Sequence, residues 1–334
     1  MSANVVFLTV ADPAIGLGHL YRCDALAGAM RGAGNNATLI VDSRRGGEWV
    51  AAHPPETEWT LSNWAHNGQV AAEAVATADL VIIDAYEMSP EVRRTIQTHA
   101  GRPVYFDDTG TNIPQQGVVI NGSPGAHLIP YPHRPGLELI LGTDYQVVRR
   151  PFWTPNDRVV RDRIETVGVM LGGTDHQGLM GDVLPVVQAT VPQSATIYAI
   201  GVEKTSMRNA TGVQATGRLA AVEIKSLFDH LDLLVTAAGQ TVAEAVACRL
   251  PTVMIQTAGN QHYNVHGWEN AGCARSAGAY DEPGFAERLS EAIHSELAVE
   301  VRRSQSEAAG AVSIHCGARR LTHRLLQSQN ASAT

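Results

Sequence analysis

The stretch VVFLTVADPAIGLGHLYRCDALAGAM, residues 5–30, joins an apolar run to a helix-like run through a glycine-containing turn. Its first six residues are apolar or β-branched, which predicts a strand in the core of a sheet. The turn contains Gly16 and Gly18, and the helical pattern begins directly after it at His19. A buried strand, a tight turn and a helix in this order are typical of a parallel α/β sheet.

The same alternation continues along the chain in two series, which predicts two sheets with right-handed crossovers. A length of 334 residues also favours two cores over one. We therefore expect an α/β protein with two Rossmann-like, doubly wound domains, residues 1–150 and 151–330, joined by a linker at Val148–Arg163. The last helical run, residues 318–327, could pack on either domain. The expected strands are Val5–Val10, Ala37–Asp42, Leu80–Asp84, Val104–Asp107, Val118–Asn121, Thr166–Leu171, Thr196–Ile200, Leu231–Ala237, Thr252–Gln256 and Ala274–Ser276.

Composition and charge narrow the class of protein. The chain has 25 basic and 33 acidic side chains and no Lys/Arg stripe, which argues against a nucleic-acid surface. Its four cysteines have neither disulfide-framework nor zinc spacing. The N-terminus lacks a signal-peptide pattern, and no apolar run reaches the roughly 20 residues that span a bilayer. We expect a soluble cytoplasmic protein without a membrane span or a cofactor. We also expect no metal, because histidines 53, 66, 99, 127 and 133 are scattered along the chain.

Candidate ligand contacts gather at strand ends of the first domain. Gly16 and Gly18 would let a ligand approach the backbone, and His19 and Arg22 share a face at the positive end of the following helix. A glycine turn with a surface histidine and arginine would give the same pattern. Further polar residues lie at the ends of later strands: Asp84, Tyr86, Asp107 and Asn121. These side chains could bind sugar hydroxyl or amide groups, or they could cap loops.

The second domain shows two similar turns. Gly172 and Gly173 follow a buried strand and precede Thr174 and Asp175, which are candidate helix caps or ligand contacts. The stretch AAGQTVAE, residues 237–244, leads from a strand into a helix whose first N–H groups could hold a phosphate. Glu244 lies one turn further and could accept the hydroxyls of a ribose, or could simply be a solvated helix residue.

Six sequence fragments occur in a fixed order along the chain: Gly16–Arg22 (G-x-G-H-x-x-R), Asp84–Tyr86 (D-x-Y), Asp107–Asp108 with Asn121, Gly142–Phe152, Gly172–Asp175 (G-G-T-D) and Ala238–Glu244 followed by Leu250–Pro251 and Asn260–Gln261. Together they resemble a known family, the PseG-type nucleotide-sugar hydrolases of pseudaminic acid synthesis, which are related to the MurG-type GT-B glycosyltransferases.

The resemblance implies a GT-B fold with its domains facing each other across a cleft. It also implies that the C-terminal domain binds UDP, that the N-terminal domain holds a sugar and that no metal takes part. His19 would be the base that activates water, and UDP would leave with inversion. The family substrate is UDP-2,4-diacetamido-2,4,6-trideoxy-β-L-altropyranose. The expected binding residues are Gly16, Gly18, Arg22, Asp84, Tyr86, Asp107, Asn121, Gly172, Gly173, Thr174, Ala238, Gly239, Gln240, Thr241, Glu244, Asn260 and Gln261.

Departures from the family pattern lie on the sugar side. Gln115 and Gln116 stand where an acid is expected, and Val147–Arg149 replaces the usual L-L-R. Three hypotheses therefore remain: a UDP-sugar hydrolase first, a GT-B glycosyltransferase with a small acceptor second, and a sugar-nucleotide-binding protein without chemistry third.

Overall fold

The computed structural model describes residues 2–13, 15–43, 47–172, 175, 178–203 and 212–332. The chain divides into two compact units, one formed by Met1–Arg149 with Cys316–Thr334 and the other by Arg150–His315. The chain passes between them twice, at residues 149–150 and 315–316. In the described part, no helix is long and apolar enough to cross a membrane.

The first unit is built on a seven-stranded, fully parallel sheet in the order β3-β2-β1-β4-β5-β6-β7. All five residues of its central strand β4 are buried, as expected of a parallel strand covered on both faces. The strands are β1 (Asn4–Val10), β2 (Asn36–Asp42), β3 (Trp59–Leu61), β4 (Leu80–Asp84), β5 (Val104–Phe106), β6 (Gly117–Asn121) and β7 (Leu137–Leu141).

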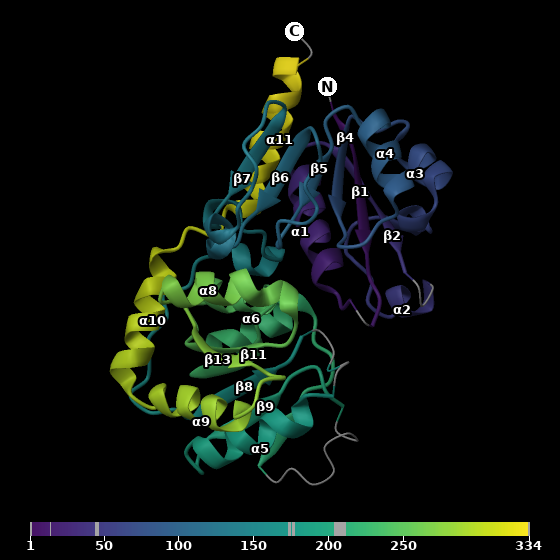
Figure 1. Cartoon of the computed structure of the whole chain (residues 1–334). Coiled ribbons are helices and arrows are strands. Elements are labelled where there is room, and N and C mark those ends of the chain that lie inside the picture. Colours follow the sequence, from purple (N-terminus) through teal and green to yellow (C-terminus); the bar gives the residue numbers. More distant parts are fainter. Residues whose placement is uncertain are drawn as a thin grey trace. The chain divides into compact units, whose positions relative to one another are not determined.

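Helices cover both faces of this sheet (Figure 1). On one face, alternate residues of β1 and β4 pack with α3 (Gly68–Val75) and α4 (Pro90–His99). Helix α1 (Gly18–Gly32) packs beside β1 and β2 and contacts α11 (Gly317–Ser332), the last helix of the chain. Helix α11 is tied to this unit by ion pairs from Arg320 to Asp144 and from Arg324 to Glu138. A short helix α2 (Gly47–Ala51) follows β2.

The second unit has a six-stranded parallel sheet in the order β10-β9-β8-β11-β12-β13. Its buried cluster joins the sheet to α5 and α9. The strands are β8 (Thr166–Met170), β9 (Thr196–Ala199), β10 (Val213–Ala215), β11 (Leu233–Ala237), β12 (Thr252–Gln256) and β13 (Arg275–Ala279); the helices are α5 (Met180–Thr190), α6 (Ala221–His230), α7 (Gln240–Ala247), α8 (His262–Asn270), α9 (Phe285–Ser295) and α10 (Val299–Ala311).

The expectation of two Rossmann-like α/β domains is confirmed by these sheets. The sequence analysis missed β3 and β10, because three-residue edge strands are too short to show a period. It also missed β7, α9 and α10. The segment Val148–Arg163, expected to be a linker, is anchored to the second unit: Phe152 is buried, and Arg158 donates to the carbonyl oxygens of Leu231 and Cys248.

In each sheet, the first strands of the chain are added on one side of the first strand, and the later strands are added on its other side. The strand order therefore reverses at one place. In the first unit this place lies between β1 and β4, and in the second between β8 and β11. Ligands of doubly wound sheets bind beyond the carboxyl ends of the strands at this switch point. The loops after these four strands are therefore the first places to look for chemistry.

Candidate active site

The β1–α1 turn carries His19 to the switch point of the first sheet. Asp12 shapes this turn: its backbone carbonyl oxygen accepts from the Gly16 N–H at 2.7 Å, and its Oδ1 accepts from the Ile15 N–H at 3.0 Å. Gly16 has φ +83°, which favours glycine. Helix α1 then begins at Gly18, so His19 and Arg22 project from its first turns toward the end of β4.

His19 forms a buried pair with Asp84, the last residue of β4. The distance between His19 Nδ1 and Asp84 Oδ1 is 2.6 Å, and the two side chains are 6% and 1% exposed. A carboxylate accepts a hydrogen bond from Nδ1–H, so this contact favours the tautomer whose lone pair is on Nε2. Within the described ranges, no hydrogen bond to Nε2 is present. The rings of Tyr86 and His19 meet edge to face, with centroids 4.4 Å apart.

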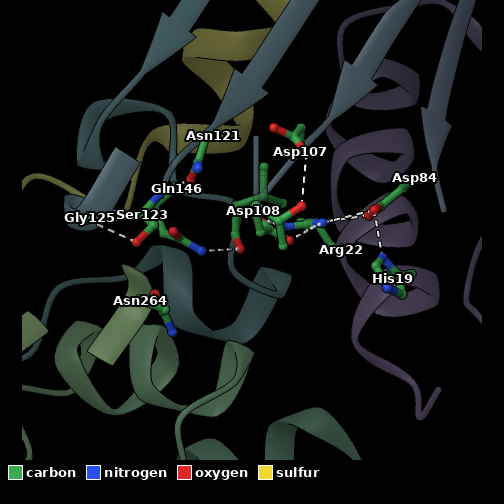
Figure 2. Close-up of polar contacts among 12 residues, drawn as sticks. His19, Arg22, Asp84, Asp107, Asp108, Asn121, Ser123, Gly125, Gln146 and Asn264 are labelled. Atoms are coloured by element: carbon green, nitrogen blue, oxygen red, sulfur yellow. Dashed lines mark hydrogen bonds and ion pairs between the residues drawn. The ribbon is translucent and has the colours of Figure 1, made fainter. Parts of the chain in front are cut away.

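Arg22 connects Asp84 to a second carboxylate, Asp108, which follows β5. Its guanidinium donates to both oxygens of Asp84 at 2.8 Å and to both oxygens of Asp108 at 2.9 and 3.0 Å. Figure 2 shows Arg22 and His19 converging on Asp84. Tyr86 Oη also donates to Asp108 at 3.2 Å, and the guanidinium carbon lies 4.5 Å from the Phe106 ring centroid. Arg22, Asp84, Tyr86 and Asp108 thus form one hydrogen-bonded network beside His19.

The network fixes the charges of its members. Burial opposes the charge of Asp84, but Arg22 and His19 outweigh it and hold the pKa of that carboxyl well below its usual range. Burial likewise opposes the charge of Arg22, yet Asp108 and Asp84 raise its pKa. Burial and the charge of Asp84 raise the pKa of the Cys23 thiol. Cys23 therefore remains a neutral S–H, which lies 3.8 Å from Asp84 Oδ2.

Asp107 and Asn121, expected to bind substrate, belong to a different network. The Asp107 carboxylate is fully buried and accepts from the backbone N–H groups of residues 110, 111 and 112 at 2.7–3.2 Å. Asn121 Nδ2 donates to Tyr131 Oη, which in turn donates to the carbonyl oxygen of Asp107. Asn121 Oδ1 accepts from the Ser123 N–H at 3.0 Å. These side chains shape the loops after β5 and β6.

The second unit presents a small-residue loop between β11 and α7. The Ala238 N–H donates to the Ile255 carbonyl oxygen, and Thr236 Oγ1 donates to that of Met170, so the loop is tied to both neighbouring strands. Gly239 caps α7 without a side chain, and a Cβ placed on it would meet nothing within 4 Å. Helix α7 begins at Gln240 and Thr241, where the sequence predicts that a phosphate binds.

Residues around this loop include the remaining expected contacts. Glu244 lies on α7 and is 5% exposed. Asn260 Oδ1 is buried and has no hydrogen-bond partner in the described part of the chain. Gln261 Oε1 accepts from the Thr257 N–H at 2.8 Å and closes the turn into α8. Asn264 Nδ2 donates to the Ala238 carbonyl oxygen at 2.7 Å, which ties α8 to the small-residue loop.

The loop after β8 is only partly described. Gly172 has φ +97°, whereas Gly173, Thr174 and His176, the histidine that follows this turn, lie outside the described residues. The Asp175 carboxylate accepts from the backbone N–H groups of Leu179 and Met180 at 2.9 and 3.0 Å. It therefore stabilises the start of α5, one of the two roles expected for it.

Sequence reasoning did not select some residues of the two networks. Asp108 was expected as a strand-end acid and as an alternative base but was not among the expected binding residues, yet its carboxylate accepts from both Arg22 and Tyr86. Tyr131 and Asn264 carried no signal, because their contacts join residues that only the folded chain brings together. A second acid directly after a strand-end Asp was the available hint for Asp108.

No protein-family model and no curated protein matches this chain. Solved structures resemble it at low identity over almost the whole length. MurG of Acinetobacter baumannii is 13% identical with a TM-score of 0.63, covering 97% of this chain and 99% of its own. The glycosyltransferase SnogD from Streptomyces nogalater is 16% identical with a TM-score of 0.64, covering 98% and 100%. LpCGTa, solved in complex with UDP, is 12% identical with a TM-score of 0.67, covering 98% and 99%. Such likeness establishes the fold alone: the chain has the two-domain GT-B fold.

Proposed function

We propose that the chain is an inverting glycosyltransferase that moves a sugar from a nucleoside diphosphate to the hydroxyl group of a small acceptor. The single observation that supports this most is the 2.6 Å contact between His19 Nδ1 and Asp84 at the switch point of the first sheet. It leaves Nε2 as a base, held in place by a carboxylate that Arg22 keeps ionised.

The reaction follows from this arrangement. His19 Nε2 takes the proton of the acceptor hydroxyl as its oxygen attacks the anomeric carbon. The bond between that carbon and the diphosphate oxygen breaks, and the nucleoside diphosphate leaves with its electron pair. Asp84 stabilises the imidazolium that forms. Attack opposite to the leaving group inverts the anomeric configuration.

The nucleotide is assigned to the second unit. The open space above Gly239 and the start of α7 suit a diphosphate, and Glu244 suits the ribose hydroxyls. LpCGTa was solved with UDP and SsfS6 with thymidine diphosphate, which supports a nucleoside diphosphate. Among the first-unit candidates, Arg22 has a positioning role in this scheme, since its guanidinium is occupied by Asp84 and Asp108.

A hydrolase is the second candidate, and the motif Gly16–Arg22 favours it through its resemblance to the PseG-type enzymes. Water then replaces the acceptor, and His19 has the same role. The sugar-binding residues of that family are only partly present, as Gln115 and Gln116 show. The fold shared with glycosyltransferases places transfer ahead of hydrolysis in our proposal.

The deciding experiment measures release of UDP from UDP-sugars and of TDP from TDP-sugars, with and without a panel of small alcohol and phenol acceptors. A transferase releases nucleotide steeply faster with the correct acceptor and forms a glycoside detectable by mass spectrometry. Release at the same rate in water alone identifies a hydrolase instead. A protein that binds nucleotide tightly but never releases it from a sugar contradicts both.

A further inference from the structure

Two histidines that the proposed chemistry does not use lie together on α8. His262 and His266 are four residues apart, and their ring centroids are 4.5 Å apart with an interplanar angle of 79°. Both side chains are exposed. The expectation of no metal rested on scattered histidines and overlooked this pair, which has the spacing of one helical turn.

The helix holds the pair in a fixed place. Val265 and Trp268 of the same helix are 4% and 1% exposed and anchor α8 in the core. Asn264 bonds to the Ala238 carbonyl oxygen, and Gln261 closes the preceding turn. The backbone that carries both imidazoles is therefore ordered before any ion arrives, which lowers the entropic cost of binding.

We propose that His262 and His266 form a two-histidine chelate for a borderline divalent ion such as Zn²⁺, Ni²⁺ or Cu²⁺. Imidazole suits these ions, and two histidines at this spacing on a helix can reach one ion from the same face. Once one imidazole has bound, the second binds at a high effective concentration. In the described part of the chain no cluster of three or more His, Cys, Asp or Glu surrounds an ion position, so water fills the other coordination positions.

A second combination of ligands could compete. Cys316 is an exposed thiol beside His315, and both types of side chain bind these ions. His315 Nδ1 already bonds to the Phe152 carbonyl oxygen at 2.9 Å, and the two residues are sequence neighbours instead of one turn apart. The geometry of α8 therefore favours the histidine pair, and a variant of Cys316 separates the two possibilities.

The test is isothermal titration of the full-length, tag-free protein with NiCl₂ near neutral pH. We expect a single ion per wild-type chain. His262→Ala and His266→Ala should each weaken its affinity at least about tenfold, because each removes the chelate. His294→Ala, which removes an exposed histidine of α9, and Cys316→Ser should leave the affinity unchanged.

Thermal unfolding supplies a second readout. Ni²⁺ should raise the Tm of the wild type and of His294→Ala, but not of the two α8 variants, whose Tm without metal should equal the wild-type value since both positions are exposed. Acidic buffer should abolish binding, because protons compete for imidazole. Absence of binding to the wild type, an unchanged affinity in either α8 variant, or loss of the site in Cys316→Ser would overturn the proposal. Neither readout depends on a nucleotide or a sugar.

Discussion

At the scale of single residues, Asp84 is the centre of the first unit's polar network. It accepts from His19 and twice from Arg22, and the Cys23 thiol lies beside it. Its folded-state pKa lies below the unfolded value, so its contribution to stability is fully present above an unfolded pKa of about 3.9 and is lost as the pH falls further toward the folded pKa. The Asp84 carboxylate therefore stays ionised throughout the neutral range.

Replacement of His19 by asparagine tests the base. Asn keeps a polar group beside Asp84 but cannot accept a proton, so we expect turnover to fall by roughly 10²–10⁴-fold while nucleotide affinity stays the same. Steady-state kinetics measures the turnover, and isothermal titration with UDP measures the nucleotide affinity. His99→Asn, an exposed histidine on α4, should behave as wild type. Wild-type turnover in His19→Asn would remove this residue from the chemistry.

The sequence predicted these residues to different extents. His19 could be placed because it follows a glycine turn directly after a strand, and Asp84 because it ends one. Their pairing could not be predicted, since 65 residues separate them and only the parallel register sets β4 beside β1. The network of Asp107, Tyr131 and Asn121 depends in the same way on neighbouring strands. The strand ends could be predicted from the sequence. Which acid shapes its own loop, as Asp107 does, and which contacts Arg22, as Asp84 and Asp108 do, could not.

At the scale of elements, the small-residue loop and the start of α7 are the turn at which we propose that the diphosphate binds. Gly239 has φ −95° and ψ −152°, an extended conformation that alanine also adopts. A Cβ placed on it would meet nothing within 4 Å. A glycine here could serve backbone strain or the close approach of a ligand, and the extended conformation shows no strain.

Replacement of Gly239 by alanine separates these two reasons. The variant should fold with an unchanged Tm, because the added methyl group meets nothing within 4 Å. It should bind UDP at least about tenfold more weakly, a loss of about 1.4 kcal/mol, because the methyl group occupies the path of the phosphate. Calorimetric titration with UDP measures this.

Gly181→Ala is the matched control for that variant. It adds a methyl group at another open position of the same unit, on α5, and should leave UDP binding unchanged. A Gly239→Ala protein that binds UDP as tightly as Gly181→Ala would place the diphosphate elsewhere.

At the scale of the whole molecule, each unit has its own hydrophobic core. Leu8 is fully buried in the cluster between the first sheet, α3 and α4, and Leu289 in the cluster between the second sheet, α5 and α9. Two cores predict two unfolding steps, so a single free energy of unfolding would not describe the chain.

Scanning calorimetry of one core variant in each unit tests whether the chain unfolds in two steps. The same measurement with UDP shows which unit binds the nucleotide. Leu8→Ala and Leu289→Ala should each destabilise one step by about 2–5 kcal/mol, and each a different one. UDP at about 100 times its Kd should add about 2.7 kcal/mol of stability to one unfolding step. This should be the step that Leu289→Ala destabilises. A single transition that both variants lower equally would show that the units unfold together. Stabilisation of the other step would move the nucleotide to the first unit.

The return of α11 to the first unit has a consequence for biosynthesis. A ribosome makes β1–β7 before the second unit, and it makes the helix that packs on α1 after that unit. The second unit therefore has its complete sequence outside the ribosome before the first unit does. The ion pairs from Arg320 to Asp144 and from Arg324 to Glu138 join this helix to residues made 176 and 186 positions earlier. Of the two units, the one whose synthesis begins first is therefore completed second.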